Sequence, residues 1–282
     1  MRERRADVLI VGGGLGGVAA ALAAASRGVD VVMSEPTDWI GGQLTSQAVP
    51  PDEHPWIERL GCTATYRALR DGIRAHYRAR FPLTAAARAQ PHLNPGACFV
   101  SRLGHEPRVA LAVLEAMLEP HVAAGRLEIL REHAPVAAEM DGDRLSAVTL
   151  RGSAGDVAVA AGWFLEASET GALLPLAGVE HVIGFESQAM TGEPHAPAAH
   201  QPGNLQPVTV CFAVDHLAGR TAARARGRGG GVALARSAER RVRRTAAREI
   251  GGCAMFVAII ATNIAHPGNL RHPGRNTPHC CS

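Results

Sequence analysis

The sequence has 282 residues, enough for one large or two ordinary domains with a sizeable core. All 29 cationic residues are arginine, and they divide the chain: residues 1–216 hold 17 Arg against 24 Asp and Glu, whereas residues 217–282 hold 12 Arg against two Glu. Six scattered cysteines without a CxxC pair exclude a dense disulfide framework and favour reduced thiols in the cytoplasm, and no apolar run predicts a membrane span.

The first predicted elements form a βαβ unit over residues 7–35. An apolar run leads into three glycines at GxGxxG spacing, namely Gly12, Gly14 and Gly17, and an alanine-rich helix and a second strand ending at Glu35 follow. Such glycines allow a tight turn, the close approach of a pyrophosphate and close helix packing, while the helix N-terminus attracts phosphate. A carboxylate at the end of the second strand accepts ribose hydroxyls and repels a 2′-phosphate. The sequence therefore predicts a dinucleotide other than NADP; a signal peptide would leave the glycines and Glu35 unexplained.

A loop over residues 36–46 comes next, and the segment from Cys62 to Arg80 then predicts an amphipathic helix. Its apolar stripe consists of Tyr66, Leu69, Ile73 and Tyr77, which we assign to the core. Its arginines are Arg67, Arg70, Arg74 and Arg78. A solvated face is the simpler interpretation of these arginines, and contact with an anionic substrate is the alternative.

A second helix is predicted to begin at residues 105–107, where Pro107 stands near the first turn. His105 and Glu106 are the two weak candidates for a catalytic role, as an acid/base pair. Capping of the helix or simple exposure is the favoured interpretation of both side chains.

Five short strands are predicted after this helix. They span residues 127–130, 136–140, 145–150, 157–159 and 163–165, and glycine-containing turns separate several of them. Helices and strands together predict an α/β fold.

Several separate motifs resemble, in order, those of a bacterial family of FAD-dependent oxidoreductases with a glutathione-reductase-like FAD domain. They are GGGLGG, SEPTDWIGGQLTSQ, VPPDEHPWIERLGCT, LNPG, SRLGHEPRVALAVLEAML, FLEASETGALLPLAG and GEPHAP, and they extend over about residues 7–216. The resemblance implies a Rossmann-like FAD-binding domain, a parallel sheet with helices and an inserted β-meander, with FAD as the tightly held cofactor. It implies no dithiol relay, because no redox cysteine pair lies between Gln43 and Gln47.

The resemblance also assigns cofactor-binding residues, region by region. The pyrophosphate would be held by Gly12, Gly13, Gly14 and Gly17, and the adenosine ribose by Glu35. The ribityl chain would run along Gly41, Gly42 and Gln43. The backbone of Val136 would face the adenine, and Ala167 and Ser168 would lie close to the cofactor. Glu169 departs from the commonest form of the turn after Ser168, which leaves its role open.

The predicted domains are an FAD-binding domain with its meander over residues 1–183, the start of a substrate-side region over 184–216, and an Arg/Ala/Gly-rich tail over 217–282. His195 and His200 stand five residues apart in a proline-rich loop of the second region, where exposure is favoured over metal binding because no third ligand follows from the spacing. No metal site is predicted.

The tail carries none of the motifs with which the family completes its FAD domain. A truncated or frame-shifted ending is our hypothesis for it, so the fold is expected to be incomplete at its C-terminus. Two alternatives are phosphate binding by the Arg/Gly-rich run at 220–248, which lacks aromatic residues for stacking, and zinc binding by His272, His279, Cys280 and Cys281.

The predicted function is that of an FAD-dependent oxidoreductase, in which the flavin passes hydride or electrons to or from an unidentified small molecule. One alternative is a non-catalytic remnant of such an enzyme. The other is an Arg-rich nucleic-acid-binding protein. No membrane partner is predicted, and the sequence identifies neither the substrate nor the oligomeric state.

Overall fold

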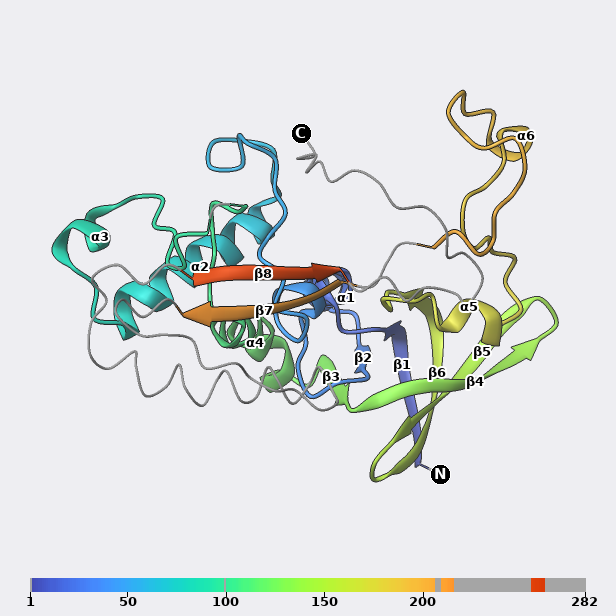
Figure 1. Cartoon of the computed structure of the whole chain (residues 1–282). Helices are drawn as coiled ribbons and strands as arrows, with labels where there is room; N and C mark the ends of the chain where they lie inside the picture. Colours follow the sequence, from blue (N-terminus) through green and yellow to red (C-terminus); the bar gives the residue numbers. More distant parts are fainter. Residues whose placement is uncertain (1, 99, 206–208, 216–254, 262–282) are drawn as a thin grey trace. The chain divides into compact units, whose positions relative to one another are not determined.

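A computed structural model of the chain describes residues 2–98, 100–205, 209–215 and 255–261 (Figure 1). The chain separates into two compact units. The first contains the described residues up to Val182 together with 211–215 and 255–259, and the second contains residues 183–205, 209–210 and 260–261.

A six-stranded mixed sheet forms the centre of the first unit, in the order β3-β2-β1-β6-β5-β4. The strands are β1 (Arg2–Val11), β2 (Val31–Glu35), β3 (Leu127–Arg131), β4 (His133–Asp141), β5 (Arg144–Gly152) and β6 (Gly155–Glu166). Strand β1 pairs in parallel with β2 and β6, and β2 pairs in parallel with β3, whereas β4, β5 and β6 pair antiparallel. The expected combination of a parallel sheet and a β-meander is present.

The helices are α1 (Leu15–Ala25), α2 (Ala64–Arg80), α3 (Ala85–Ala89), α4 (Pro107–Ala123), α5 (Leu173–Leu176) and α6 (Gln188–Thr191), and η1 (Gly42–Leu44) is a turn of 3₁₀ helix. Helix α4 contacts both α1 and α2. Together these three helices bury Ile10 and Met33 on one side of the sheet. The neighbouring residues Leu9, Val11 and Val32 belong to a second apolar cluster, with side chains of β5 and β6. Because residues 9–11 of β1 and 31–33 of β2 are buried, these parts of the two strands read as continuous apolar runs.

Strand β6 differs from the prediction of two short strands at 157–159 and 163–165, because it continues without a break from Gly155 to Glu166. Strand β1 begins at Arg2, and residues 2–6 of β1 pair with residues 157–161 of β6. Gly162, taken for a turn, stays within the strand, where an added Cβ would lie 3.3 Å from the Asp7 carbonyl oxygen. The third strand of the meander is therefore also the parallel neighbour of β1.

Strands β7 (Thr209–Asp215) and β8 (Met255–Ala261) form a separate two-stranded sheet. The Arg/Gly-rich run at 220–248 and the proposed zinc ligands His272, His279, Cys280 and Cys281 lie outside the described residues. In the described part of the chain, each helix is too short or too polar to cross a lipid bilayer.

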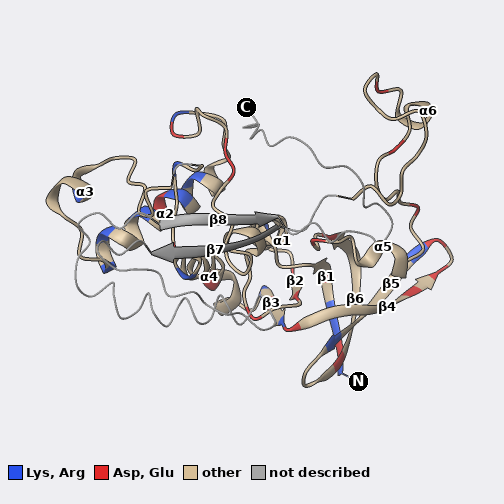
Figure 2. Cartoon of the chain, viewed as in Figure 1, with Lys and Arg blue, Asp and Glu red and all other residues tan. Residues whose placement is uncertain are grey.

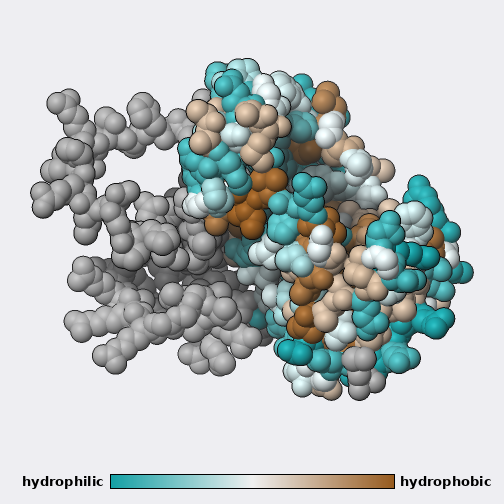
Figure 3. Space-filling model, turned by 90° about the vertical axis from the view of Figure 1, so that its right-hand side faces the viewer, coloured by the Kyte–Doolittle hydropathy of each residue, from teal (hydrophilic) through white to brown (hydrophobic). Residues whose placement is uncertain are grey.

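Large apolar side chains are exposed in both units. Trp163 of β6 is 74% exposed, and Phe185 of the second unit is 55% exposed. Apolar side chains also reach the surface on the face of the molecule shown in Figure 3.

Candidate functional site: the glycine loop at the strand ends

The GxGxxG loop joins the end of β1 to the start of α1, and close backbone contacts require glycine at two of its positions, Gly12 and Gly17. Gly12 has a φ of +106°, and a side chain there would collide with the backbone of Ala167 and Ser168. A side chain at Gly17 would collide with the carbonyl oxygen of Gly12. The ends of β1 and β6 and the first turn of α1 therefore meet without side chains between them.

Helix α1 begins with an open N-terminus. Gly14 is its N-cap residue, no side chain caps the helix, and its first turn contains no acidic residue. An added Cβ at Gly14 would come within 3.0 Å of the Glu169 side chain. The backbone amides and the helix dipole can therefore attract an anion at this position.

Glu35 ends β2 with a buried carboxylate, only 5% exposed. Its Oε2 atom accepts a hydrogen bond of 3.1 Å from the Gly13 amide. Its Oε1 atom accepts hydrogen bonds from the Thr37 amide, at 2.9 Å, and the Thr37 hydroxyl, at 2.7 Å. Thr37 was not singled out from the sequence, although a hydroxyl two residues beyond the strand end is the available signal for such a contact. The acid predicted to bind ribose thus lies directly beside the glycine loop.

The loop after β2 also lies against the glycine loop. The Gly41 amide donates a hydrogen bond of 2.8 Å to the Gly13 carbonyl oxygen. Gly41 and Gly42 both have positive φ, +102° and +51°, and a side chain at Gly41 would overlap Leu114 and Thr45. Gln43 is exposed, and its carbonyl oxygen accepts a 2.8 Å hydrogen bond from Val49. The structure therefore brings Gly41 and Gly42 beside the residues expected to hold the pyrophosphate.

The turn after β6 lies against the glycine loop. The Ala167 amide donates to the Val11 carbonyl oxygen at 2.8 Å, and the Ser168 hydroxyl accepts from the Ala172 amide at 2.9 Å. The Glu166 carboxylate accepts from the amides of Ser168 and Leu173, both at 2.6 Å. The next acid, Glu169, is exposed and directs its carboxylate against Gly14 and Gly42.

Val136 lies further along the sheet, on β4. The register between β4 and β5 shifts between Pro135 and Ala137, so Val136 has no partner across the ladder. A bulge of this kind leaves backbone groups available for other contacts. Strand β4 contacts β2.

His105 and Glu106 precede α4, and their environments differ from the favoured interpretation. His105 is buried, at 5% exposed, and its Nδ1 atom lies 2.9 Å from the Leu103 carbonyl oxygen. Burial lowers its pKa, against the opposing effect of backbone contacts with Leu103 and Leu44. Glu106 occupies the N-cap position without a side-chain capping bond, while its amide donates to the Tyr77 hydroxyl at 2.7 Å. Simple exposure is therefore wrong for His105, and side-chain capping is wrong for Glu106.

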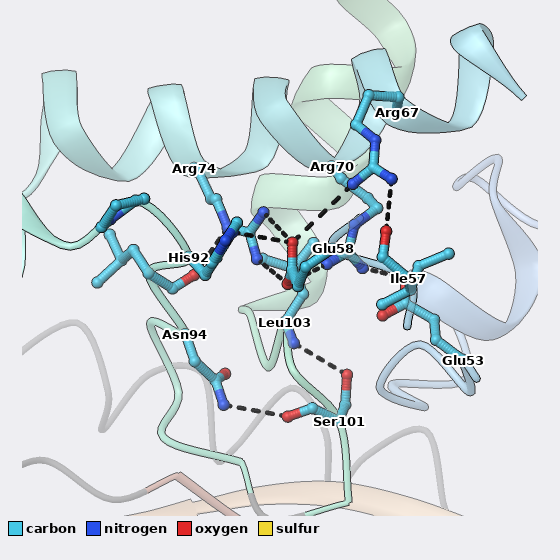
Figure 4. Close-up of polar contacts among 12 residues, drawn as sticks. Glu53, Ile57, Glu58, Arg67, Arg70, Arg74, His92, Asn94, Ser101 and Leu103 are labelled. Atoms are coloured by element: carbon cyan, nitrogen blue, oxygen red, sulfur yellow. Dashed lines mark hydrogen bonds and ion pairs between the residues drawn. The ribbon is translucent and has the colours of Figure 1, made fainter. Parts of the chain in front are cut away.

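The arginines of α2 also differ from the prediction of a solvated face. Figure 2 shows basic positions recurring along α2, but Arg70 is 1% exposed and Arg74 is 3% exposed. Two acids from the preceding loop, Glu53 and Glu58, accept hydrogen bonds from them (Figure 4). The prediction failed because these partners lie outside the helix, where helical periodicity carries no information about them.

Glu58 is the centre of this buried cluster. It contacts Arg70 at 2.5 Å, Arg74 at 2.6 Å and His92 at 3.2 Å, and Arg67 lies 3.9 Å away (Figure 4). Burial alone would raise the pKa of Glu58, but the Arg74 hydrogen bond and the surrounding positive charges outweigh it and lower the pKa. The cluster ties the 50–60 loop to α2, so an anionic substrate would have to displace Glu58 from its existing partners.

Glu53 forms the other end of the cluster. It accepts hydrogen bonds from Arg70 and from the Tyr66 hydroxyl, the latter at 2.6 Å. Burial, followed by the contact with Glu53, raises the pKa of Tyr66. Tyr66 and Tyr77 are both in or against the core, as the apolar stripe predicted.

The described residues contain no cluster of three potential metal ligands. One ring nitrogen of His200 lies 2.9 Å from the Ile183 carbonyl oxygen.

A family model described as "FAD dependent oxidoreductase" matches residues 7–268 of this chain. The match runs beyond residue 216, where the resemblance recognised from individual motifs ends. The glycine-lined approach to α1 and the carboxylate at the tip of β2 fit the phosphates and the adenosine ribose of FAD.

The chain also resembles several solved structures. The protein BexE shares 24% identity at a TM-score of 0.37, and the alignment covers 64% of this chain and 36% of BexE. OxyS anhydrotetracycline hydroxylase from Streptomyces rimosus shares 21% identity at a TM-score of 0.35, with 62% and 34% covered. The myxobacterial chondrochloren halogenase CndH shares 18% identity at a TM-score of 0.35, with 58% and 37% covered. The chain thus spans 34% to 37% of the length of these proteins.

Proposed function

This chain belongs to the FAD dependent oxidoreductase family, and we propose that it binds FAD at the ends of β1, β2 and β6 and uses it to oxidise or reduce a small molecule. Bound FAD supplies the hydride- or electron-transferring ring. The chain's own residues hold and orient the dinucleotide.

The contact between Gly13 and Glu35 is the observation that best supports this proposal. It places a buried carboxylate 3.1 Å from the amide of the phosphate-binding loop, at the end of the neighbouring parallel strand. In an open α/β sheet, ligands bind outside the carboxyl ends of the strands. An acid in this position can accept the ribose hydroxyls while the loop amides and the start of α1 bind phosphate.

We assign the other predicted residues to successive parts of the cofactor. The pyrophosphate is held by Gly12, Gly13, Gly14 and Gly17. The loop containing Gly41, Gly42 and Gln43 carries the ribityl chain, because Gly41 is hydrogen-bonded to Gly13. The unpaired bulge at Val136 presents backbone to the adenine. Ala167 and Ser168 lie beside Gly12, close to the cofactor.

The geometry around the two catalytic candidates supports a structural role more than acid/base chemistry. His105 is buried against the backbone carbonyls of Leu103 and Leu44, so it connects the segment before α4 with η1. Glu106 supplies an amide to Tyr77. We propose that the protein's substrate is a small molecule and assign neither residue to its conversion.

The visible absorption spectrum of the purified chain tests this proposal. Bound flavin absorbs in the blue and near ultraviolet, so the protein should be yellow as isolated or after addition of FAD and gel filtration. A chain that is colourless after incubation with excess FAD and gel filtration would refute the proposal. Reduction of the bound flavin by candidate electron donors, followed as bleaching of the same bands, then tests oxidoreductase activity.

A further inference from the structure

Three segments that are distant in the sequence meet at one point of the proposed FAD site. They are Gly14 at the start of α1, Gly42 at the start of η1, and Glu169 after β6. The Glu169 Oε1 atom would lie 3.0 Å from a Cβ added to Gly14, and it would collide with one added to Gly42. The carboxylate therefore fills space that the two glycines leave beside the backbone.

The same features that attract a phosphate to this position also attract a carboxylate. Helix α1 has no capping side chain and no acid of its own in the first turn, so its positive end is open to an external anion. A carboxylate and a phosphate this close repel each other, and the repulsion is stronger beside protein than in bulk water. A negative charge at Glu169 therefore disfavours a pyrophosphate at the start of α1.

Glu169 differs from the other two acids at the proposed FAD site in how it is held. Both oxygens of Glu35 and both oxygens of Glu166 accept hydrogen bonds from backbone amides or Thr37. Glu169 is exposed, and no hydrogen bond or ion pair anchors its side chain to the rest of the described chain. The Glu169 side chain can therefore move away from Gly14 and Gly42 without the loss of a specific contact.

We propose that the charge of Glu169, beside Gly14 and Gly42, opposes binding of the cofactor's pyrophosphate and sets the affinity for FAD below that of a chain with a neutral side chain at this position. This inference rests on the proposed function, since it concerns the same FAD site. The carboxylate stays near the phosphates in any rotamer because the short turn after β6 holds its backbone.

The test is a fluorescence titration with FAD, and separately with ADP, of the wild-type chain, Glu169→Gln and Glu169→Asp. Removing the charge should tighten binding of both ligands about two- to five-fold at low salt, the size expected for one exposed charge pair. Aspartate keeps the charge on a shorter side chain and should give an intermediate affinity. The advantage of Gln over the wild type should shrink in 0.5 M NaCl, where the Debye length falls to roughly 4 Å. Glu180→Gln, at an exposed acid beyond α5, is the matched control and should leave both affinities unchanged.

The outcomes separate this inference from the proposed function. Equal or weaker binding by Glu169→Gln, with the wild type still binding FAD, overturns the role of Glu169 alone. If neither protein binds FAD or ADP, both proposals fail. Binding by Glu169→Gln but not by the wild type is the strongest support, because neutralising one carboxylate would then have permitted binding. Thermal melts of all four proteins should coincide, which excludes unfolding as the cause of a difference.

Discussion

The carboxylate of Glu35 accepts a 3.1 Å hydrogen bond from the backbone amide of Gly13, across two adjacent parallel strands. In the proposed FAD site, this contact determines where the ribose lies relative to the phosphates, because one partner belongs to the strand tip and the other to the glycine loop. The two hydrogen bonds from Thr37 hold the opposite oxygen and keep the carboxylate oriented. Affinity for the cofactor should therefore depend on the charge of Glu35.

Glu35→Gln should weaken FAD binding by roughly tenfold, the loss expected when a charged hydrogen-bond acceptor becomes neutral. The amide group must also place either an N–H or an oxygen toward Gly13, so part of the existing network is lost. The affinity is measured by titrating the cofactor-free protein with FAD. Glu139→Gln, at an exposed position of β4, is the control and should bind FAD like the wild type. Equal affinity of the two variants would remove Glu35 from the site.

Gly17 and Gly16 are adjacent glycines of α1 that should respond oppositely to alanine. A methyl group at Gly17 collides with the Gly12 carbonyl oxygen, which belongs to backbone and cannot rotate away, whereas nothing lies within 4 Å of one at Gly16. Gly17→Ala should lower the free energy of unfolding by about 1–3 kcal/mol, the usual cost of overpacking. Gly16→Ala should raise it by up to about 1 kcal/mol through helix propensity. Urea denaturation of both variants measures the difference, and similar values would contradict the close packing of α1 on β1.

The βαβ unit could be predicted from sequence because each of its signals is local. Residues buried on both faces of the sheet give uninterrupted apolar runs, and Gly12 and Gly17 stand where backbone contact forbids a side chain. The family and its FAD cofactor were also predicted correctly, from motifs that extend well beyond this unit.

Features that depend on distant partners could not be predicted in the same way. Residues 2–6 extend β1 and hold β6 as one strand, although Gly162 suggested a turn. The buried Arg70 and Arg74 are matched by Glu58, which precedes their helix. Helical periodicity assigns a residue to a face but does not identify what the face meets, so charged residues with distant partners were placed in solvent.

Glu58→Gln tests the buried cluster of Figure 4. In the variant, Arg70 and Arg74 lose the carboxylate to which both donate hydrogen bonds. Loss of one partner of a buried ion pair lowers the free energy of unfolding by about 3 kcal/mol. The folded-state pKa of Glu58 is lowered, so its contribution is present above the usual value of 4.5 and is lost as pH falls below it. Denaturation at pH 7 and at pH 4 should show the larger deficit at pH 7.

The exposed pair of Arg151 and Asp156 provides the control for this variant. Their side chains meet at 3.2 Å between β5 and β6, but the arginine is 64% exposed. Asp156→Asn should leave the unfolding transition unchanged, because exposed ion pairs contribute little. A deficit in Asp156→Asn as large as that in Glu58→Gln would show that burial is not what makes the cluster important.

The last prediction concerns His105 and the stability of the chain at mildly acidic pH. Burial lowers the pKa of His105 in the folded state below its usual value of 6.5. The unfolded chain therefore takes up a proton at a higher pH than the folded chain, so the free energy of unfolding decreases as pH falls below about 6.5. His105→Gln cannot titrate in this range and keeps a side-chain N–H for the Leu103 carbonyl oxygen. Its stability should change less between pH 7 and pH 5 than that of the wild type.

The control for this prediction is His76→Gln, because burial and the nearby Arg80 lower the pKa of His76 as well. His76 lies closer to the surface than His105, so it should account for the smaller part of the pH dependence. Urea unfolding of the three proteins at pH 5, 6 and 7 gives the comparison. A pH dependence that survives in His105→Gln and disappears in His76→Gln would contradict the lowered pKa of His105 and assign the effect to His76.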